Sequence, residues 1–289
     1  MLIRLVGVLV GALALVAAPA LADPVKVVAA ENFYGDIAAQ IGAADVAVTS
    51  ILTNPDQDPH LFEASTATAK ALANAKVVIA NGADYDPWIE KLIAANTAPG
   101  RREIFVARLV GRKAGDNPHL WYDPAYVVAA ARAISAALAE ADPAHKDDYA
   151  KGEAAFVASL APLDAEIAAM KAKYAGQPIA LSEPVFGYQA ALIGLTVRNQ
   201  GFALSVMNDT EPSASQVAGF EDDLTKHRVK AMLFNAQASE PAVQRLVEMA
   251  KANGIPVVGV SETEPPGKNY QAWMLDQLEA LDRALSGGV

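Results

Sequence analysis

The sequence predicts an α/β protein with two βα-sheet domains joined by one long helix. Short β-branched runs alternate with longer helical stretches in both halves of the chain, which is typical of parallel sheets covered by helices. Between the halves, residues 146–174 carry a helical pattern with no strand signal, and at about 1.5 Å per residue such a helix could span a domain. The length of 289 residues is enough for two domains of ordinary size.

Composition excludes several classes of protein. Hydrophobic residues make up 53% of the chain and charged residues 19%, which excludes a disordered polypeptide. The formal net charge of −10 argues against a nucleic-acid binder, because such proteins present a basic face. The absence of cysteine excludes disulfide frameworks, cysteine-based zinc modules, iron–sulfur clusters and thiol nucleophiles.

Residues 1–22 are predicted to be a secretory signal peptide. Arg4 precedes an apolar run over Leu5–Ala18, and Ala20-Leu21-Ala22 provides a small-x-small cleavage site. The apolar run is shorter than the roughly 20 residues of a membrane-spanning helix. With no second such run and no lipobox cysteine, we expect a soluble periplasmic protein without a lipid anchor.

The N-terminal domain is predicted over residues 23–141. Its helices begin at clear caps: Ser65 or Thr66 caps one helix, and Asp86-Pro87 and Asp123-Pro124 place an N-cap before a proline at the first helical position. The expected strands are Val25–Ala30, Val46–Leu52, Lys76–Ala80 and Glu103–Val106, and the expected helices include Tyr34–Ile41, a helix ending at Asn74 and Ala125–Ala141.

The linking helix is predicted over residues 142–176, and the second α/β domain over residues 177–289. In that domain the expected strands are Pro178–Ser182, Leu195–Asn199, Lys230–Asn235 and Pro256–Val260, and the expected helices are Gln189–Ile193, Ser213–Lys226, Glu240–Asn253 and Tyr270–Leu285. Open α/β sheets bind ligands beyond the carboxyl ends of their strands. The cleft between the two sheets is therefore the expected site.

Two of the four histidines, His60 and His119, lie in loops of the first domain. Each follows a proline, which keeps the preceding residue extended and can direct the imidazole. Either one alone could be an ordinary turn histidine with satisfied hydrogen bonds, whereas the two together favour a shared ligand. His145 and His227 lie in charged helix ends, and we expect both at the surface.

Acidic residues follow two predicted strands of the second domain. Glu183 follows Pro178–Ser182, and Glu262 and Glu264 follow Pro256–Val260. Such acids can simply mark the exit of a strand to solvent or cap a following helix. Two histidines and two carboxylates at strand ends, however, make an N₂O₂ set that suits Zn²⁺ or Mn²⁺.

Four ordered segments resemble a known family. Asp58-Pro59-His60-x-Phe62-Glu63, Asn117-Pro118-His119-Leu120-Trp121-x-Asp123-Pro124, Glu183-x-x-Phe186-Gly187-Tyr188 and Glu211-Pro212-Ser213 are similar to segments of the zinc/manganese substrate-binding proteins of ABC importers. The resemblance covers essentially the whole mature chain. It implies two α/β domains joined by one rigid long helix, with the metal in the cleft between them.

The resemblance also implies a ligand set and partners. His60, His119 and Glu183 would be the first three metal ligands, and a membrane permease of an ABC importer would receive the ion from a monomeric receptor. Zinc receptors often have histidine at the position of Glu183 and a His-rich loop that this chain lacks, whereas manganese and iron receptors usually have glutamate. The family's fourth ligand is usually an aspartate. Here it is Glu262, which leaves the strand directly, or Glu264 as the alternative.

We therefore expect a receptor for a divalent metal ion and not an enzyme. The likeness of the segment around Glu262 to unlipidated zinc-type receptors favours Zn²⁺, with Mn²⁺ or Fe²⁺ as the alternative. A metal-dependent hydrolase would keep an open coordination position and a general base, for which Glu264 or Asp123 are candidates, but no His-Glu-x-x-His motif or nucleophile elbow is present. An exported adhesin of the same fold would need an anchor.

Overall fold

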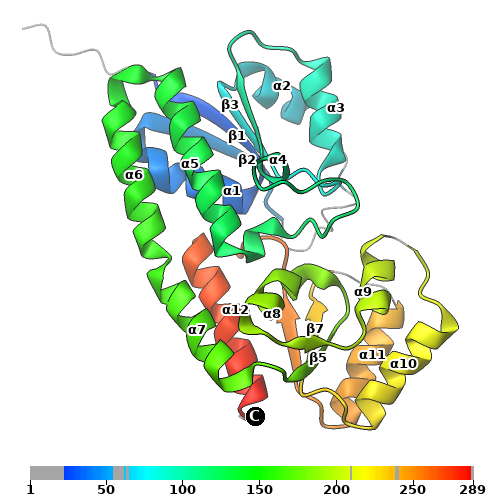
Figure 1. Cartoon of the computed structure of the whole chain (residues 1–289). Coiled ribbons are helices and arrows are strands. Elements are labelled where there is room, and N and C mark those ends of the chain that lie inside the picture. Colours follow the sequence, from blue (N-terminus) through cyan, green and yellow to red (C-terminus); the bar gives the residue numbers. More distant parts are fainter. Residues whose placement is uncertain (1–22, 55–61, 63–64, 209, 238–240, 288–289) are drawn as a thin grey trace, which may run out of the picture.

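The chain folds around two four-stranded parallel sheets, one in each half of the molecule (Figure 1). The computed structural model describes residues 23–54, 62, 65–208, 210–237 and 241–287, so the predicted signal peptide lies outside the described residues. The first sheet has the order β2-β1-β3-β4. Its strands are β1 (Val25–Glu31), β2 (Val46–Leu52), β3 (Val77–Ala80) and β4 (Arg102–Phe105).

The second sheet has the order β6-β5-β7-β8. Its strands are β5 (Pro178–Leu181), β6 (Thr196–Val197), β7 (Met232–Asn235) and β8 (Val257–Val260). All strand pairs in both sheets are parallel, as the alternation of strand and helix patterns predicts. The predicted fold of two parallel-sheet α/β domains is therefore confirmed, while the domain limits themselves stay a prediction.

Helices of the first half include three that begin at a predicted cap, and two of these three caps form the expected bond. Ser65 forms a capping box with Thr68, and the Asp123 carboxylate accepts a hydrogen bond from the backbone of Ala125. Asp86 precedes Pro87 as expected but makes no capping bond, because its carboxylate instead accepts the backbone N–H groups of the loop after β3. These helices are α1 (Asn32–Gly42), α2 (Thr66–Asn74), α3 (Pro87–Ala95), α4 (Val106–Leu109) and α5 (Pro124–Ala141).

Helices of the second half include one that the sequence did not predict, α9 (Gln200–Met207). The residue before it, Asn199, makes no capping bond because its side chain pairs with the backbone N–H and C=O of Leu181. The remaining helices are α8 (Gly187–Ile193), α10 (Ala214–Thr225), α11 (Pro241–Ala252) and α12 (Tyr270–Leu285).

The connection between the halves is helical but is not the single rigid helix predicted. It consists of α6 (Lys146–Ser159) and α7 (Ala161–Tyr174), which follow one another along one side of the molecule (Figure 1). The helical run is interrupted at Leu160, because Pro162 lacks the N–H that a continuous helix needs and its ring crowds the preceding turn. Asp142-Pro143 starts only a short 3₁₀ turn before α6.

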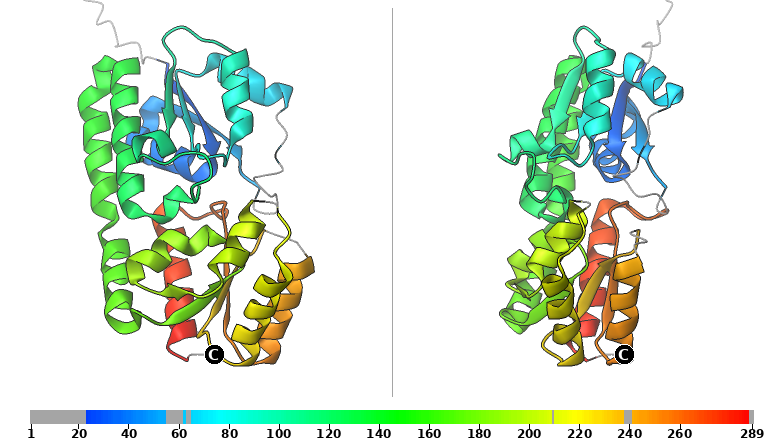
Figure 2. Two further views of the ribbon diagram at one scale, coloured as in Figure 1. Left: turned by 45° about the vertical axis from the view of Figure 1, so that its right-hand side comes forward. Right: turned by 90° about the vertical axis from the view of Figure 1, so that its right-hand side faces the viewer.

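The two halves share one apolar core. Aromatic side chains from both halves meet at its centre, where the Phe33 ring stacks on Trp121 with centroids 4.4 Å apart and lies 5.9 Å from Trp273. The buried Tyr122 hydroxyl lies 2.7 Å from both the Ser261 carbonyl and the Gln277 side-chain oxygen. Figure 2 shows the halves stacked in two further views, with α12 beside the connecting helices. None of the helices described is long and apolar enough to cross a bilayer.

The contact between α6 and α1 gives a stability prediction. A Cβ at Gly152 would lie 2.1 Å from the Ile41 carbonyl oxygen, so Gly152→Ala must separate the two helices. We expect it to lower the free energy of unfolding by about 2 kcal/mol, as other overpacked contacts do. The matched control is Gly219→Ala in α10, where nothing lies within 4 Å and higher helix propensity should add stability. Urea unfolding of both variants tests this; equal midpoints would contradict the close contact.

Candidate metal centre

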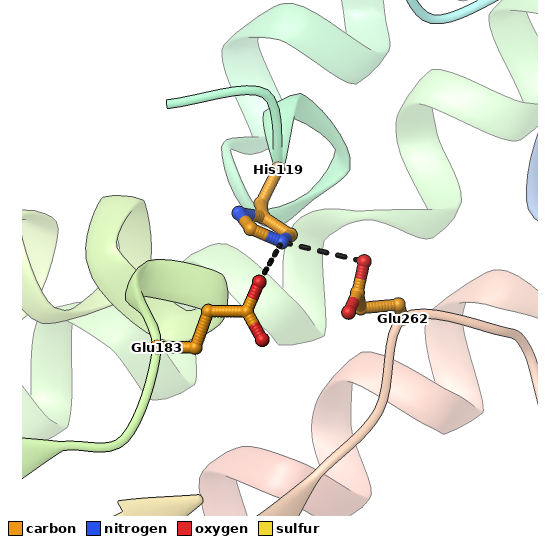
Figure 3. Close-up of side chains that lie close together, drawn as sticks. All are labelled: His119, Glu183 and Glu262. Carbon is orange, nitrogen blue, oxygen red and sulfur yellow. Dashed lines mark ion pairs between the residues drawn. The ribbon is translucent and has the colours of Figure 1, made fainter. Parts of the chain in front are cut away.

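Three ligand-type side chains from distant parts of the sequence meet between the two halves. His119, Glu183 and Glu262 each offer an atom within 4.8 Å of the others, and Figure 3 shows their side chains converging. All three are buried, with 0%, 6% and 1% of their surfaces exposed. Buried charges are costly unless they are paired or bind a metal, and a divalent cation between the three side chains would balance the two carboxylates.

Local structure directs each of these side chains inward. His119 ends the loop that leads into a 3₁₀ turn at Leu120–Tyr122. Glu183 follows β5 and precedes a second 3₁₀ turn at Pro184–Phe186, while Glu262 follows β8 after one intervening residue. The two glutamates therefore leave the carboxyl ends of strands of one parallel sheet, which is the edge where open α/β sheets bind ligands.

The distances in this group fit a shared ion better than a direct ion pair. His119 Nε2 lies 3.4 Å from Glu262 Oε2 and 3.8 Å from Glu183 Oε1, drawn as dashed lines in Figure 3. Charge-assisted hydrogen bonds are shorter, about 2.7–2.9 Å. Two ligands on one tetrahedral Zn²⁺, at bond lengths of about 2.0–2.2 Å, lie about 3.3–3.5 Å apart. The observed spacing is close to that value.

The His119 ring is oriented by Asn117. Asn117 Oδ1 lies 2.7 Å from His119 Nδ1, and Asn117 Nδ2 donates to the Pro184 carbonyl at 2.8 Å, which fixes the orientation of the amide. Because an amide oxygen only accepts, the network assigns the proton to Nδ1 and the lone pair to Nε2. This is the tautomer that a metal-binding histidine requires. Asn117 also ties the loop of the first half to the Glu183 segment of the second.

Both glutamates are held by Asn235, the last residue of β7. Its Nδ2 lies 2.8 Å from Glu183 Oε2 and 2.5 Å from Glu262 Oε1. The neighbouring Gln237 side chain accepts the backbone N–H groups of Glu262 and Thr263 at 2.6 and 2.9 Å. Both carboxylates are thus fixed through their side chains, and Glu262 is also fixed through its backbone, which favours a preformed site.

A buried acidic network lies behind the His119 loop. Asn81 donates to the Pro118 carbonyl at 2.8 Å and accepts the Tyr34 hydroxyl at 2.8 Å. Burial and then the Asp86 carboxylate raise the pKa of Glu31 well above its ordinary value. These contacts support the loop that carries the imidazole.

Between this network and the metal centre, burial and the carboxylate of Glu262 raise the pKa of Tyr85 well above its ordinary value.

Glu264, the alternative fourth ligand, lies elsewhere. Its backbone pairs with the Asn32 side chain at 2.7 and 3.1 Å, and it is not part of the group formed by His119, Glu183 and Glu262. Burial, together with the nearby Asp36 carboxylate, raises the pKa of Glu264 to about 8. The bonds between Glu264 and Asn32 thus form a contact between the two halves of the molecule.

The remaining histidines divide as follows. His60, the first predicted ligand, lies outside the described residues. His145 is partly exposed, with its ring 2.6 Å from Asp142, and His227 is exposed after the end of α10. The surface positions predicted for these two residues agree with the structure.

Sequence reasoning missed Asn117, Asn235 and Tyr85 as contributors to this centre. Asn235 ends a predicted strand beside the two that precede Glu183 and Glu262, so the rule that singled out the acids also applies to it. Asn117 stands two residues before His119 in the quoted segment. For Tyr85 the sequence carries no comparable signal, because it lies in a loop whose acids and proline already indicate a helix start.

Two parallel-sheet halves with buried ligand-type side chains gathered between them define a two-lobed solute-binding protein. Comparison with solved structures supports the fold of such a protein. The periplasmic zinc-binding protein TroA from Treponema pallidum superposes with a TM-score of 0.77, covering 91% of this chain and 99% of that protein, at 18% sequence identity. At that identity the likeness shows the fold alone.

Two curated relatives are similar in sequence. The manganese-binding lipoprotein MntA of Bacillus subtilis is 27% identical over 242 residues, which cover 79% of this chain and 76% of the relative. The iron ABC transporter substrate-binding lipoprotein MtsA of Streptococcus pyogenes serotype M1 is 23% identical over 288 residues, 91% of this chain and 90% of the relative.

The chain belongs to the family described as "Zinc-uptake complex component A periplasmic", whose model matches residues 27–284. The resemblance inferred from the four ordered segments is thereby confirmed. Members of this family are solute-binding receptors of ABC transporters and not enzymes. The chain is accordingly a substrate-binding protein of a metal ABC transporter, and the hydrolase alternative is set aside.

Proposed function

We propose that this chain captures Zn²⁺ at a four-ligand site formed by His60, His119, Glu183 and Glu262, and delivers the ion to the membrane permease of an ABC importer. The ion is the cargo of the receptor and takes part in no reaction on it. Mn²⁺ or Fe²⁺ is the alternative cargo, because the curated relatives described above are named for manganese and iron.

One observation carries the proposal: the His119 imidazole presents Nε2 to two buried carboxylates, 3.4 Å from Glu262 Oε2 and 3.8 Å from Glu183 Oε1. An imidazole with its Nδ1 proton engaged by Asn117 is a neutral ligand. The set of one imidazole and two carboxylates supplies two negative charges, which match a divalent cation. His60 enters the ligand set only through the segment Asp58-Pro59-His60, so its role rests on the sequence.

The choice of zinc rests on ligand number and geometry. Two imidazoles and two carboxylates make a tetrahedral set, which zinc prefers, whereas manganese takes more ligands and more oxygen. Intrinsic affinity for nitrogen and oxygen sites is also higher for zinc than for manganese. Glu183 argues for manganese or iron instead, since receptors for those ions usually have glutamate at this position.

Location and assembly complete the proposal. We place the mature chain in the periplasm as a monomer, exported by residues 1–22 and without a lipid anchor, because the sequence has no cysteine to carry one. The relatives MntA and MtsA are lipoproteins, so the anchor is a point in which this chain differs from them.

Calorimetric titration of the metal-free protein with Zn²⁺ and with Mn²⁺ tests the proposed cargo. We expect one site per chain and tighter binding of Zn²⁺. Tighter binding of Mn²⁺ would move the cargo to the alternative, and no binding of either ion, nor of Fe²⁺, would overturn the metal receptor.

Glu262→Gln and Glu264→Gln separate the two candidates for the fourth ligand. We expect Glu262→Gln to weaken Zn²⁺ binding at least tenfold, about 1.4 kcal/mol, because it removes a carboxylate oxygen that lies 3.4 Å from His119 Nε2. Glu264→Gln is the matched control two residues away and should change affinity less. A competition assay with a chelator measures both. The reverse order would transfer the fourth position to Glu264.

A further inference from the structure

Asn235 contacts both carboxylates of the proposed site through a single nitrogen. Its Nδ2 lies 2.8 Å from Glu183 Oε2 and 2.5 Å from Glu262 Oε1. An amide nitrogen carries two hydrogens, so it can donate one to each glutamate. The Asn235 side chain thereby lies between two acidic groups whose charges would otherwise repel one another in a buried setting.

The orientation of this amide is set by its other end. Asn235 Oδ1 accepts the backbone N–H of Gln237 at 3.0 Å, so the oxygen and the nitrogen cannot exchange places without losing that bond. The Asn235 backbone N–H in turn donates to Ser182 Oγ at 3.0 Å, next to Glu183. With 3% of its surface exposed, Asn235 is a fixed element of the site.

The oxygens that Asn235 binds are not the ones that face the imidazole. His119 Nε2 is closest to Oε1 of Glu183 and to Oε2 of Glu262, whereas the amide holds Oε2 of Glu183 and Oε1 of Glu262. Each carboxylate therefore has one oxygen on the amide and the other toward the histidine. An ion next to the imidazole meets one oxygen of each glutamate.

We propose that Asn235 determines metal specificity by holding Glu183 and Glu262 as monodentate ligands, which limits the coordination number and favours Zn²⁺ over Mn²⁺. Zinc sites are usually four-coordinate, and each monodentate carboxylate contributes one bond. Manganese prefers oxygen-rich octahedral coordination, which two bidentate carboxylates would help to complete. The inference rests on the proposed function and assigns this selectivity to a residue that is not itself a ligand.

Asn235→Ala is the first test. We expect the ratio of the Mn²⁺ dissociation constant to the Zn²⁺ dissociation constant to fall at least tenfold, because either carboxylate can then rotate to bind through both oxygens. The visible absorption of bound Co²⁺, which is stronger in four-coordinate than in five- or six-coordinate sites, should weaken in the variant. If Asn235 only stabilised the fold, the visible absorption of bound Co²⁺ would be the same in the variant as in the wild-type protein.

The second variant guards against a failure to fold. Asn235→Leu has a similar volume, adds no third carboxylate and removes the two donors, and we expect the same change in ratio and spectrum. The control is Gln271→Ala, which removes a buried amide whose bonds go to Gln40 and Ser159. It should keep the wild-type ratio and the wild-type Co²⁺ spectrum.

The outcomes separate this inference from the proposed function. Equal weakening of Zn²⁺ and Mn²⁺ binding with an unchanged Co²⁺ spectrum would overturn the role of Asn235 in specificity and leave the metal receptor intact. An unchanged ratio in Asn235→Leu would overturn it as well. Failure of the wild-type protein to bind Zn²⁺, Mn²⁺ or Co²⁺ would instead overturn the proposed function.

Discussion

His119→Ala is expected to weaken Zn²⁺ binding by at least about a hundredfold. Loss of residues that only support a metal ligand costs about 10–100-fold in affinity, and the loss of a ligand should cost at least as much. The imidazole is fully buried between the two carboxylates, at 3.4 and 3.8 Å.

Two further variants complete this experiment. His60→Ala should weaken binding by a similar factor if it supplies the second imidazole. His227→Asn is the control, because His227 is exposed and its positive φ of 52° suits asparagine. Calorimetric titration of all three checks the expectation, with circular dichroism to verify the fold. Affinities of His60→Ala and His119→Ala within about twofold of wild type would contradict the ligand assignment.

Removal of the metal should lower the melting temperature markedly. A ligand that binds only the native state stabilises it by about 4 kcal/mol when its free concentration is a thousand times the dissociation constant. For a protein of this size that corresponds to a shift on the order of 10 °C. We therefore expect EDTA to lower the melting temperature of the zinc-loaded protein at neutral pH, and excess Zn²⁺ to restore it. A melting temperature indifferent to EDTA would contradict the proposed site.

The same stabilisation should depend on pH in a definite direction. The proposed ligands, two imidazoles and two carboxylates, bind an ion only when deprotonated, so the metal-bound state carries fewer protons than the metal-free state. Stabilisation by Zn²⁺ is then complete above the pKa values of the free ligands and is lost as the pH falls through them. We expect the loss to grow as the pH falls from about 7 toward about 5, the range in which unperturbed histidine becomes protonated. Melting curves with and without Zn²⁺ across this range measure it.

Much of the fold follows from local patterns in the sequence. Val46–Leu52 and Tyr270–Leu285 have the predicted bounds, because a run rich in β-branched residues and a clear helical periodicity end at polar breakers. The connection between the halves was predicted as one helix, since its periodicity runs through Leu160. There the local geometry of Pro162 outweighs the pattern, and two helices result.

Side-chain partners were harder to predict than elements. Asp86 was predicted as a helix cap from its place before Pro87, yet its carboxylate binds the backbone of Asn81 and Gly82, residues close enough in sequence to compete for it. Asn199 likewise bonds to Leu181 on a neighbouring strand. The partner of Asn199 depends on which groups tertiary packing brings close in space, and a linear sequence pattern does not contain those distances.

The candidate site shows the same difference between what a local sequence pattern predicts and what depends on tertiary contacts. The rule that functional side chains follow the carboxyl ends of parallel strands identified Glu183 and Glu262. His119 was identified as a candidate ligand because a proline precedes it. The structure brings these three together. The supporting amides of Asn117 and Asn235 were not predicted, because asparagine in loops and at strand ends has many ordinary roles and its bonds here reach across 67 and 52 residues of sequence.

The most direct test of the receptor is its metal content as the cell loads it. The protein is purified from the periplasm without added metal and analysed by mass spectrometry, with His119→Ala treated in parallel. We expect about one zinc ion per wild-type chain, little manganese or iron, and loss of the zinc in the variant. Wild-type protein that carries no divalent metal, or a variant that retains as much zinc as wild type, would contradict the account.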